Sequence, residues 1–277
     1  MNMVNAMKVR MRLWVKITLT IITILVLLFV YGRFINTMGY KVHEYTINSN
    51  IPESFNGLKI VHISDINYKH STSKEALKRI VKRINLINPD VIVFTGDLLN
   101  VHLTYTKEDI DDITNILREM NAKIGKFAVY GEEDIEFDDY EKILNNSNFI
   151  LLDNDYQVLY NKSNEPIIIA GMSNDEKDIN LPNINTYNIL LTHKPDNINE
   201  IDYSNYDLIL AGHSLGGYIN IPGIKNLLLP NGAKKYYKDY YRLDNTRLYI
   251  SNGLGTKYVR FRILNKPSFN FYRINKK

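Results

Sequence analysis

The sequence predicts an α/β protein in which two packed sheets are flanked by helices, a four-layer α/β/β/α arrangement, preceded by one N-terminal transmembrane helix. Three observations support this prediction. The chain first alternates buried strands with amphipathic helices, then continues with short strands and few helices, and it carries one long apolar run near its N-terminus.

The apolar run is LWVKITLTIITILVLLFVY, residues 13–31, with a single charge at Lys16. A bilayer span needs about 20 apolar residues, and a lysine near its end can extend to the interface. A cleaved signal peptide is the alternative, but it would have a shorter apolar core followed by small residues, whereas GRFINTMGYK follows here. We therefore expect an uncleaved anchor.

The basic residues around the anchor predict its orientation. Four precede its apolar centre and one follows it, which favours a cytoplasmic N-terminus over residues 1–12. Residues 32–44 are then a linker, and residues 45–277 form one domain on the extracytoplasmic side of the cell membrane. The expected protein is single-pass and contacts membrane lipid through its N-terminal helix.

Composition excludes several function classes. The chain has no cysteine, so disulfides, thiolate zinc sites and cysteine nucleophiles are excluded. Residues 34–220 hold 16 basic and 28 acidic residues, whereas residues 221–277 hold 13 basic and 2 acidic residues. This segregated charge contains no recognisable nucleic-acid-binding motif, so we expect no nucleic-acid partner.

Three amphipathic segments are expected to be helices. In STSKEALKRIVKRINLINPD, Thr72 and Glu75 have capping-box spacing, the apolar residues fall on one face, and Pro89 marks the stop. KEDIDDITNILREM and DDYEKILNNS are the second and third. The expected strands read, in chain order, HEYTIN, LKIVHIS, VIVFTGD, KFAVYG, FILLD, YQVLY, PIIIAG, YNILLTH, YDLILAGH and RLYISNG.

Small and polar residues follow five of these strands. In α/β sheets, ligands bind outside the carboxyl ends of the strands, so five such ends with Asp, Glu and His indicate one site. The five segments are SDIN (64–67), TGDLLN (95–100), GEED (131–134), LTHKPD (191–196) and AGHSLGG (211–217).

With these motifs the sequence resembles the calcineurin-like metallophosphoesterases of the membrane-anchored bacterial type, over about residues 45–275. YDLILAGHSLGGYINIPGI and LYISNGLGT are especially close to that family. The resemblance implies an α/β/β/α sandwich and metal-dependent hydrolysis of a phosphoester or phosphodiester. It also implies two metal ions about 4 Å apart.

Four motif positions depart from the family. A D-x-H motif reads Asp65-Ile66-Asn67, and a G-H-x-H motif ends in Leu215 instead of histidine. In the G-N-H-acid motif, Glu132 replaces the asparagine ligand and Glu133 replaces the histidine that protonates the leaving group. Because a nearby cation would lower the pKa of Glu133, we expect that it does not replace that histidine.

The departures fall unevenly on the two implied metal ions. The first ion keeps Asp65 and Asp97, with help from the Asn67 carbonyl oxygen, while Leu215 cannot coordinate. The second ion keeps two carboxylates and two imidazoles, a set that suits zinc, manganese or iron. We therefore expect one tightly bound ion per chain, with the ligands Asp97, Glu132, His193 and His213.

Several residues have a competing interpretation. Glu132 could belong to a solvated acidic turn, and His70 could reach the first site or lie in a solvated loop. His62 has the opposite strand parity to Asp65 and should point away from the site. The basic stretch KKYYKDYYR (234–242) fits either anionic lipid headgroups or a surface loop with packing tyrosines. Arg260 matches a basic position of the family.

Two functions remain open. The first is a weak phosphoesterase, supported by the retained Asp65, Asp97, His193 and His213. A phosphorylated lipid or another cell-envelope phosphoester is a possible substrate. The second is a catalytically inactive, membrane-tethered binding or scaffolding domain, supported by the four departures.

Overall fold

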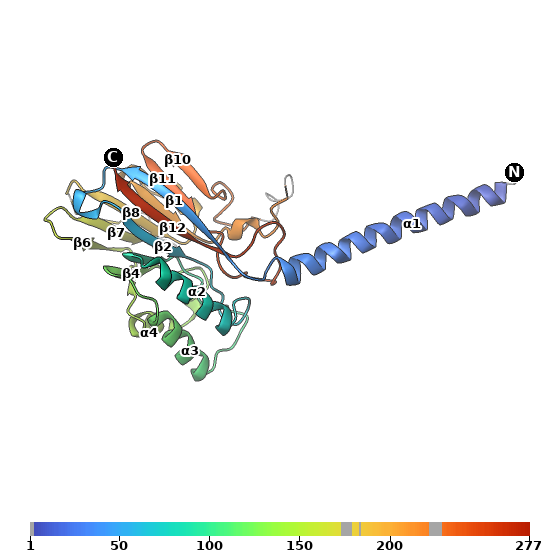
Figure 1. Cartoon of the computed structure of the whole chain (residues 1–277), viewed down its shortest axis with the longest axis horizontal. Coiled ribbons are helices and arrows are strands. Elements are labelled where there is room, and N and C mark those ends of the chain that lie inside the picture. The colour runs from blue at the N-terminus through green and yellow to red at the C-terminus, as the bar shows by residue number, and fades with distance from the viewer. Residues whose placement is uncertain (1–2, 173–178, 183, 222–228) are drawn as a thin grey trace.

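The computed structural model describes residues 3–172, 179–182, 184–221 and 229–277. In these residues a long N-terminal helix, α1 (Met3–Val30), projects from a globular domain that holds all the strands (Figure 1). The part of the chain that is described has one helix long and apolar enough to cross a membrane, over Arg12–Ile35. That helix covers residues 13–31, where the sequence predicts a membrane anchor.

The domain contains two six-stranded sheets within the described ranges. The first has the order β1-β12-β2-β3-β4-β5, in which only the β12–β2 pair is antiparallel. Its strands are β1 (Lys41–Ser49), β12 (Ser268–Lys276), β2 (Leu58–Ile63), β3 (Val91–Phe94), β4 (Gly125–Ala128) and β5 (Ile150–Leu151).

The second sheet has the order β10-β11-β9-β8-β7-β6, with antiparallel pairs at both edges and parallel strands between them. Its strands are β10 (Tyr240–Leu243), β11 (Thr246–Ile250), β9 (Leu208–Ala211), β8 (Tyr187–Thr192), β7 (Ile167–Met172) and β6 (Asp155–Leu159).

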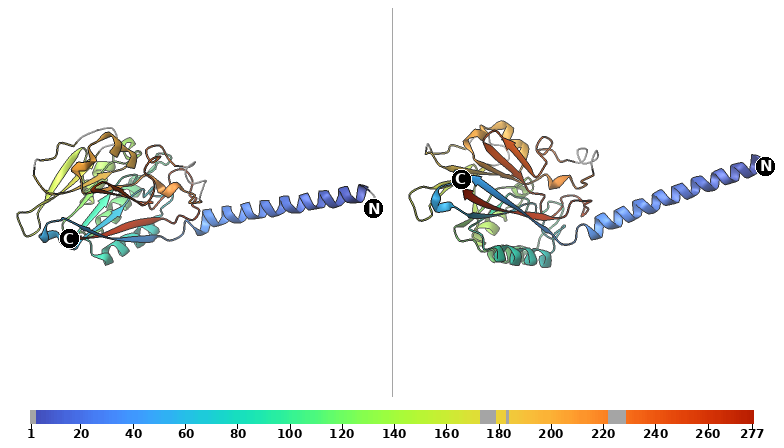
Figure 2. Two further views of the ribbon diagram at one scale, coloured as in Figure 1. Left: turned by 90° about the horizontal axis from the view of Figure 1, so that it is seen from above. Right: turned by 45° about the horizontal axis from the view of Figure 1, so that its top comes forward.

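Three apolar cores separate the four layers. Helices α2 (Lys74–Ile87), α3 (Lys107–Arg118) and α4 (Tyr140–Asn146) pack on the outer face of the first sheet (Figure 2). A second core lies between the sheets. The described residues on the outer face of the second sheet include the 3-10 turns η4 (Pro195–Glu200) and η5 (Tyr203–Asn205). The α/β/β/α prediction is confirmed, with a fourth layer of short turns.

Three local expectations need correction. The N-cap of α2 is Ser73, whose side chain accepts a hydrogen bond from the Ala76 amide, so Thr72 does not cap this helix. Strands β10 and β12 were not expected. The apolar residues of β12 lie on both faces of the first sheet, so the strand lacks the alternation of a half-buried strand.

The expected linker at 32–44 is largely part of the domain. A π-helical turn, η1 (Tyr31–Ile35), continues α1, and β1 begins at Lys41 and pairs with β12 over nine residues. The Gly32 carbonyl accepts a hydrogen bond from the Arg262 amide, and the rings of Phe29 and Phe261 stack 6.0 Å apart. The anchor therefore contacts the domain directly.

Candidate metal centre

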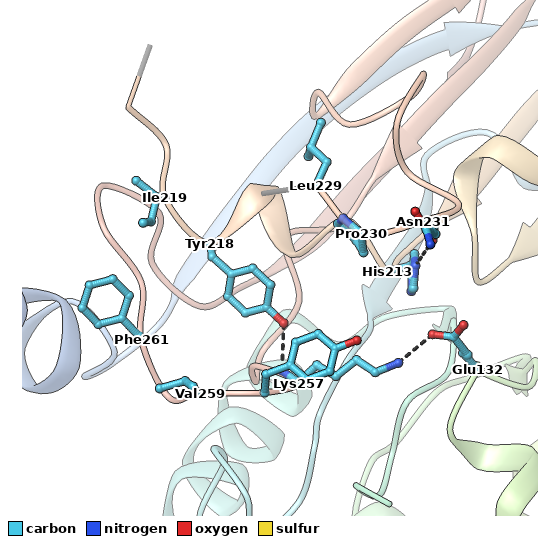
Figure 3. A pocket seen from close by; sticks show the side chains of 11 residues that line it. Glu132, His213, Tyr218, Ile219, Leu229, Pro230, Asn231, Lys257, Val259 and Phe261 are labelled. Carbon is cyan, nitrogen blue, oxygen red and sulfur yellow. Dashed lines mark hydrogen bonds and ion pairs between the residues drawn. The ribbon is translucent and has the colours of Figure 1, made fainter. Parts of the chain in front are cut away.

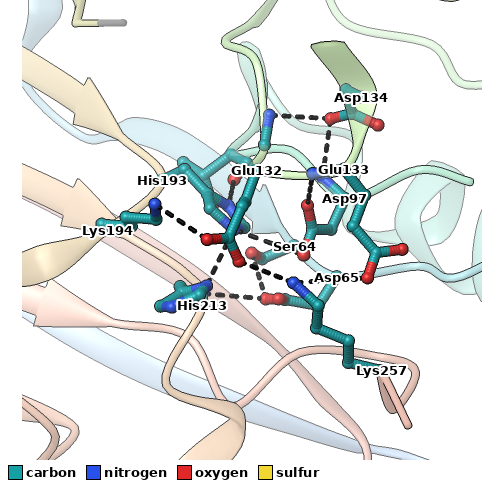
Figure 4. A network of polar contacts seen from close by, with 12 residues as sticks. Ser64, Asp65, Asp97, Glu132, Glu133, Asp134, His193, Lys194, His213 and Lys257 are labelled. Atoms are coloured by element: carbon teal, nitrogen blue, oxygen red, sulfur yellow. Dashed lines mark hydrogen bonds and ion pairs between the residues drawn. The ribbon is translucent and has the colours of Figure 1, made fainter. Parts of the chain in front are cut away.

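The five polar segments meet at the carboxyl ends of the strands, as expected for this type of sheet. Asp65, Asp97 and Glu133 follow strands β2, β3 and β4 of the first sheet. His193 and His213 follow β8 and β9 of the second sheet. Figure 4 shows their side chains converging between the two sheets, and all five residues are buried.

The backbone at this site is unusual. Asp65, Asp97 and His213 have φ values of 50°, 59° and 63°, and the substituted positions Asn67 and Leu215 have 46° and 50°. Positive φ is uncommon for residues other than glycine and is most costly for a bulky side chain such as leucine. Strand parity therefore does not apply to Asp65 and Asn67. Asn67 and Leu215 thus share the positive φ of Asp65, Asp97 and His213.

Close approach of two loops also constrains the site. Gly131, before the acidic segment, lies so near Asp97 that an added Cβ would clash with the Asp97 backbone nitrogen and carboxylate. The Asp134 carboxylate accepts hydrogen bonds from the amides of Asp97, Leu98 and Gly131, at 2.7, 2.9 and 2.8 Å. Asp134 therefore holds the two loops together.

Asp97, His193 and His213 form the one group in the described residues that could hold a metal ion, with their ligand atoms within 4.8 Å of one another. His193 Nε2 lies 3.3 Å from Asp97 Oδ2 and 3.1 Å from His213 Nδ1. Each of the three residues is at most 2% exposed. Two imidazoles and a carboxylate are the ligand types that zinc, manganese and iron accept.

The other nitrogen of each imidazole is fixed by a carbonyl oxygen. His193 Nδ1 lies 2.6 Å from the Thr95 carbonyl oxygen, and His213 Nε2 lies 2.6 Å from that of Asn231. Since a carbonyl only accepts, both nitrogens must donate, which directs the lone pairs of His193 Nε2 and His213 Nδ1 toward each other. Such facing lone pairs need a proton or a cation between them. The residues fit a metal ion, with the orienting hydrogen bonds typical of metal-binding histidines.

Electrostatics at the trio also favours a cation. Burial lowers the pKa of His193, but the Asp97 carboxylate outweighs burial and raises that pKa to about 9. Burial and the neighbouring His193 lower the pKa of His213 to about 4. Burial would raise the pKa of Asp97, but His193 lowers it well below its usual range. Asp97 is thus an ionised carboxylate stabilised by positive charge at His193, the charge that a bound cation would supply instead.

The other predicted ligands of the first ion do not join this group. The Asp65 carboxylate accepts hydrogen bonds from Ser64 Oγ at 2.5 Å and from the His213 amide at 3.1 Å. Burial raises the pKa of Asp65 to about 6. Asn67 is fully buried, and its carbonyl oxygen accepts a hydrogen bond from Asn100 Nδ2 at 2.8 Å. Leu215 is buried and apolar.

Glu132, expected as a ligand of the retained ion, is paired with two lysines instead. Its Oε2 lies 2.6 Å from Lys257 Nζ and its Oε1 lies 3.0 Å from Lys194 Nζ. Burial opposes ionisation, but the hydrogen bonds from these lysines lower the pKa of Glu132 to about 2. The Glu132 carboxylate therefore lies outside the metal-capable trio, in an exposed turn where it pairs with two lysines.

Glu133 is buried beside the same lysine. Its Oε2 accepts a hydrogen bond from the Val101 amide at 3.1 Å, and its Oε1 lies 3.3 Å from Lys257 Nζ. Burial and the Asp97 charge raise the pKa of Glu133, which is the direction a general acid needs, although Lys257 acts against this shift.

Two histidines outside the trio have separate environments. His62 is buried between the sheets, with Nε2 2.9 Å from Thr95 Oγ1, and burial lowers its pKa to about 3. His70 is half-buried and lies outside the metal-capable group of the described residues. His62 lies outside the trio but between the sheets, so its strand parity relative to Asp65 does not explain its position. His70 gives no support for a rescue of the first ion.

Sequence reasoning missed Lys194, Lys257 and Arg262. Arg262 is fully buried and donates hydrogen bonds to the carbonyl oxygens of Leu215, Asn252, Gly253 and Gly255. It thereby fixes the loop after β9 against the loop after β11. The family resemblance had singled out Arg260, two residues earlier, instead. A lysine or arginine in a loop carries no periodic signal, so only the fold reveals these contacts.

The basic stretch at 234–242 packs onto the second sheet. The amides of Lys234, Lys235 and Tyr236 donate to the Asp196 carboxylate in η4, and Tyr236 is 6% exposed. Tyr236 also makes an edge contact with Tyr241. These contacts favour the interpretation of packing tyrosines over a lipid-binding loop.

A cavity of about 540 Å³ opens beside the centre (Figure 3). Glu132, His213 and Lys257 line its polar end. At the other end Figure 3 shows apolar side chains that include Val259 and Phe261 near the end of α1. The cavity therefore joins the charged centre to the surface around the anchor.

The two sheets, the polar strand ends and the buried histidine–aspartate trio define a metal-dependent phosphoester hydrolase scaffold. The chain belongs to the calcineurin-like phosphoesterase family, whose model matches residues 58–217.

Three relatives illustrate this membership. The chain is 31% identical over 256 residues to the uncharacterized metallophosphoesterase YkuE of Bacillus subtilis, covering 88% of each chain. It is 27% identical to the UDP-2,3-diacylglucosamine pyrophosphatase LpxG of Chlamydia trachomatis, covering 89% of this chain and 94% of that protein. It is 25% identical to a zebrafish (Danio rerio) transmembrane protein with a metallophosphoesterase domain, covering 90% of this chain and 60% of that protein.

Proposed function

We propose that this protein is a membrane-anchored phosphoester hydrolase that uses one divalent transition metal ion. The observation that carries the proposal is the trio of Asp97, His193 and His213, whose imidazole lone pairs converge on one point while carbonyl oxygens hold the opposite nitrogens. An ion at such a site supplies Lewis-acid stabilisation of phosphoryl transfer. Zinc, manganese and iron all suit these ligands.

The residues around the trio perform the orienting work. Thr95 and Asn231 hold the two imidazoles, and Asp65 holds the loop of His213 through the amide of that residue. Glu133 stands at the motif position of the family's proton-donating histidine, but Lys257 next to it favours its ionised form. We therefore propose slow hydrolysis, limited by poor protonation of the leaving group.

The cavity supports a phosphorylated amphiphile as substrate. Its charged end suits a phosphoryl group and its apolar end, beside the anchor, suits a hydrocarbon chain. Phe261 lines this end and stacks on Phe29 of α1. A membrane lipid or lipid-linked cell-envelope phosphoester could enter there without leaving the bilayer surface.

The first experiment combines metal analysis with an activity assay on the full chain in detergent. We expect one ion per chain after dialysis against Mn²⁺ or Zn²⁺, and slow hydrolysis of an activated aryl phosphodiester. His193→Ala should lose both, whereas His102→Ala, at an exposed histidine, should keep both. An ion-free and inert wild type would contradict the proposal.

A non-catalytic binding domain is the second candidate. It is favoured by the ion pairs of Glu132 with Lys194 and Lys257, since Glu132 and Lys257 line the polar end of the cavity and satisfy each other's charge. It predicts an inert protein that still binds phosphorylated amphiphiles. The same assay separates it from the hydrolase.

We also propose that the domain faces the extracytoplasmic side, supported by the basic residues before the anchor. The native chain has no cysteine, and Asn164 is exposed in the loop between β6 and β7. Asn164→Cys in intact cells should react with a membrane-impermeant thiol reagent. Reaction only after lysis would reverse the proposed topology.

A further inference from the structure

Lys257 is the feature of the site that neither the family assignment nor the metal trio explains. Its side chain is 11% exposed, which is rare for lysine unless its charge is paired. Its Nζ lies 2.6 Å from Glu132 Oε2 and 3.3 Å from Glu133 Oε1, and Figure 4 shows it directed into the polar network. The network thus already contains one cation of its own.

The main chain of Lys257 is held in place from two sides. Its amide donates a hydrogen bond to the Tyr218 hydroxyl at 3.2 Å, and its carbonyl accepts one from Asn100 Nδ2 at 2.9 Å. The same Asn100 amide group donates to Asn67, at the substituted position of the first implied ion. The residue that replaces a histidine ligand is therefore linked through Asn100 to the lysine.

The positions expected to hold the other implied ion offer few ligand atoms, and a positive charge already lies beside them. Leu215 offers no donor atom, and the Asn67 carbonyl oxygen is hydrogen-bonded to Asn100. Oxygens of Glu132 and Glu133 contact Lys257 Nζ. A divalent ion would have to bind such oxygens at about 2.1 Å, so it and the ammonium group would compete for the same atoms and repel each other.

We propose that the ammonium group of Lys257 takes the place of a second metal ion and binds the phosphoryl oxygens of the substrate. This inference rests on the proposed function, because it assigns the second positive charge of the same site. Lys257 lines the cavity together with His213, so its charge faces the space that a phosphoryl group would enter. The Glu132 side chain is 41% exposed, so its ion pair with Lys257 can open to water and Lys257 can bind the phosphoryl group instead.

The experiment measures binding, not turnover. Inorganic phosphate is titrated into the full chain in detergent with one equivalent of Mn²⁺, using wild type, Lys257→Met and Lys257→Arg. A hydrogen bond to a charged group contributes about 1.5–3 kcal/mol, so Lys257→Met should bind phosphate about 10- to 100-fold more weakly. Lys257→Arg should keep most of the affinity because it keeps the charge.

A second measurement counts metal ions at excess Mn²⁺. Wild type and Lys257→Met should each hold one ion, because Asn67 and Leu215 offer no free ligand atom for another one in either protein. Lys194→Met is the matched control. Lys194 contacts Glu132 but not Glu133 in the described contacts, so this variant should stay at one ion. Thermal unfolding of each variant confirms that it is folded.

The outcomes are distinct. Phosphate affinity unchanged in Lys257→Met, at the same ion content as wild type, would overturn the proposal. A wild type without any ion would instead contradict the proposed function, while the phosphate titration would still decide the role of Lys257.

Discussion

The two halves of the site share positive backbone φ values, but they differ in the ligand atoms that their side chains offer. On one side, Asp97, His193 and His213 keep both their ligand atoms and the carbonyl oxygens that orient the imidazoles. On the other, Asn67 and Leu215 keep the positive φ of their positions but offer no free ligand atom. The difference shows that positive φ alone does not make a ligand position, because the side chain and its hydrogen-bond partners decide whether a ligand atom is free.

The largest effect should come from rebuilding the substituted half. The designed variant combines Asn67→His, Leu215→His, Glu133→His and Glu132→Asn. A histidine at 133 supplies a leaving-group acid with a pKa near neutrality, and general acid catalysis is typically worth about 10²–10⁴-fold. We expect a gain of that order in the hydrolysis of an activated aryl phosphodiester with Mn²⁺ present. A variant that binds two ions and stays inert would show that the difference between the halves is not what limits activity.

The next effect concerns metal affinity in the retained half. Loss of a group that merely orients a ligand typically costs 10–100-fold in affinity, so His193→Ala should cost about 100-fold or more. Asn67→Ala should leave the affinity nearly unchanged, since Asn67 is bonded to Asn100. Equilibrium titration with Zn²⁺ measures both. Equal losses would place Asn67 in the metal site and end the distinction between the halves.

The next prediction concerns the pH dependence of stability, which we attribute to the buried His62 outside the trio. His62 is buried, which lowers its folded-state pKa to about 3, against about 6.5 in the unfolded chain. Between these values the unfolded state binds the additional proton. Stability is therefore unaffected by His62 above pH about 6.5 and falls as the pH drops toward 3, by up to about 1.4 kcal/mol per pH unit.

His62→Gln should flatten this slope, measured as the free energy of unfolding at a series of pH values. His102→Gln, at an exposed position, should keep the wild-type slope. A slope unchanged by His62→Gln would assign the acid sensitivity to the trio or to Asp65 instead.

The smallest effect tests whether the substituted half is now structural. Asn67→Ala removes the acceptor of the buried hydrogen bond from Asn100, and one such bond contributes about 1 kcal/mol. The free energy of unfolding should fall by about that amount. A stability equal to wild type would mean that Asn67 has no structural role.

The parts of the molecule that the sequence predicted are those with a local signal. Buried strands such as β3 and β7 are continuous apolar runs, and the acidic and histidine residues at their ends gather because parallel strands end at one edge. Strand β12 was missed because its aromatic and polar residues do not alternate. Lys257 was missed for another reason. Its partner Glu132 lies 125 residues earlier, and no pattern in either segment predicts the contact.

The pairing of Glu132 also shows why substitution patterns mislead. By position it is the replacement for a ligand, and a carboxylate is a competent oxygen donor. The fold supplies two lysines within 3.0 Å of it, and their charges satisfy the carboxylate in place of an ion. A ligand position can be assigned from its motif only when the residues opposite it are known.

The direct contact between α1 and the domain sets how the molecule would search for its substrate. Gly32 lies against Phe261, and an added Cβ there would clash with the Phe261 ring, so the end of the helical segment packs directly on the wall of the cavity. With α1 in a bilayer, lateral diffusion carries the opening at a nearly constant height. The encounter rate then depends on the number of substrate molecules per unit area of membrane, and dilution of the surrounding solution would leave it unchanged.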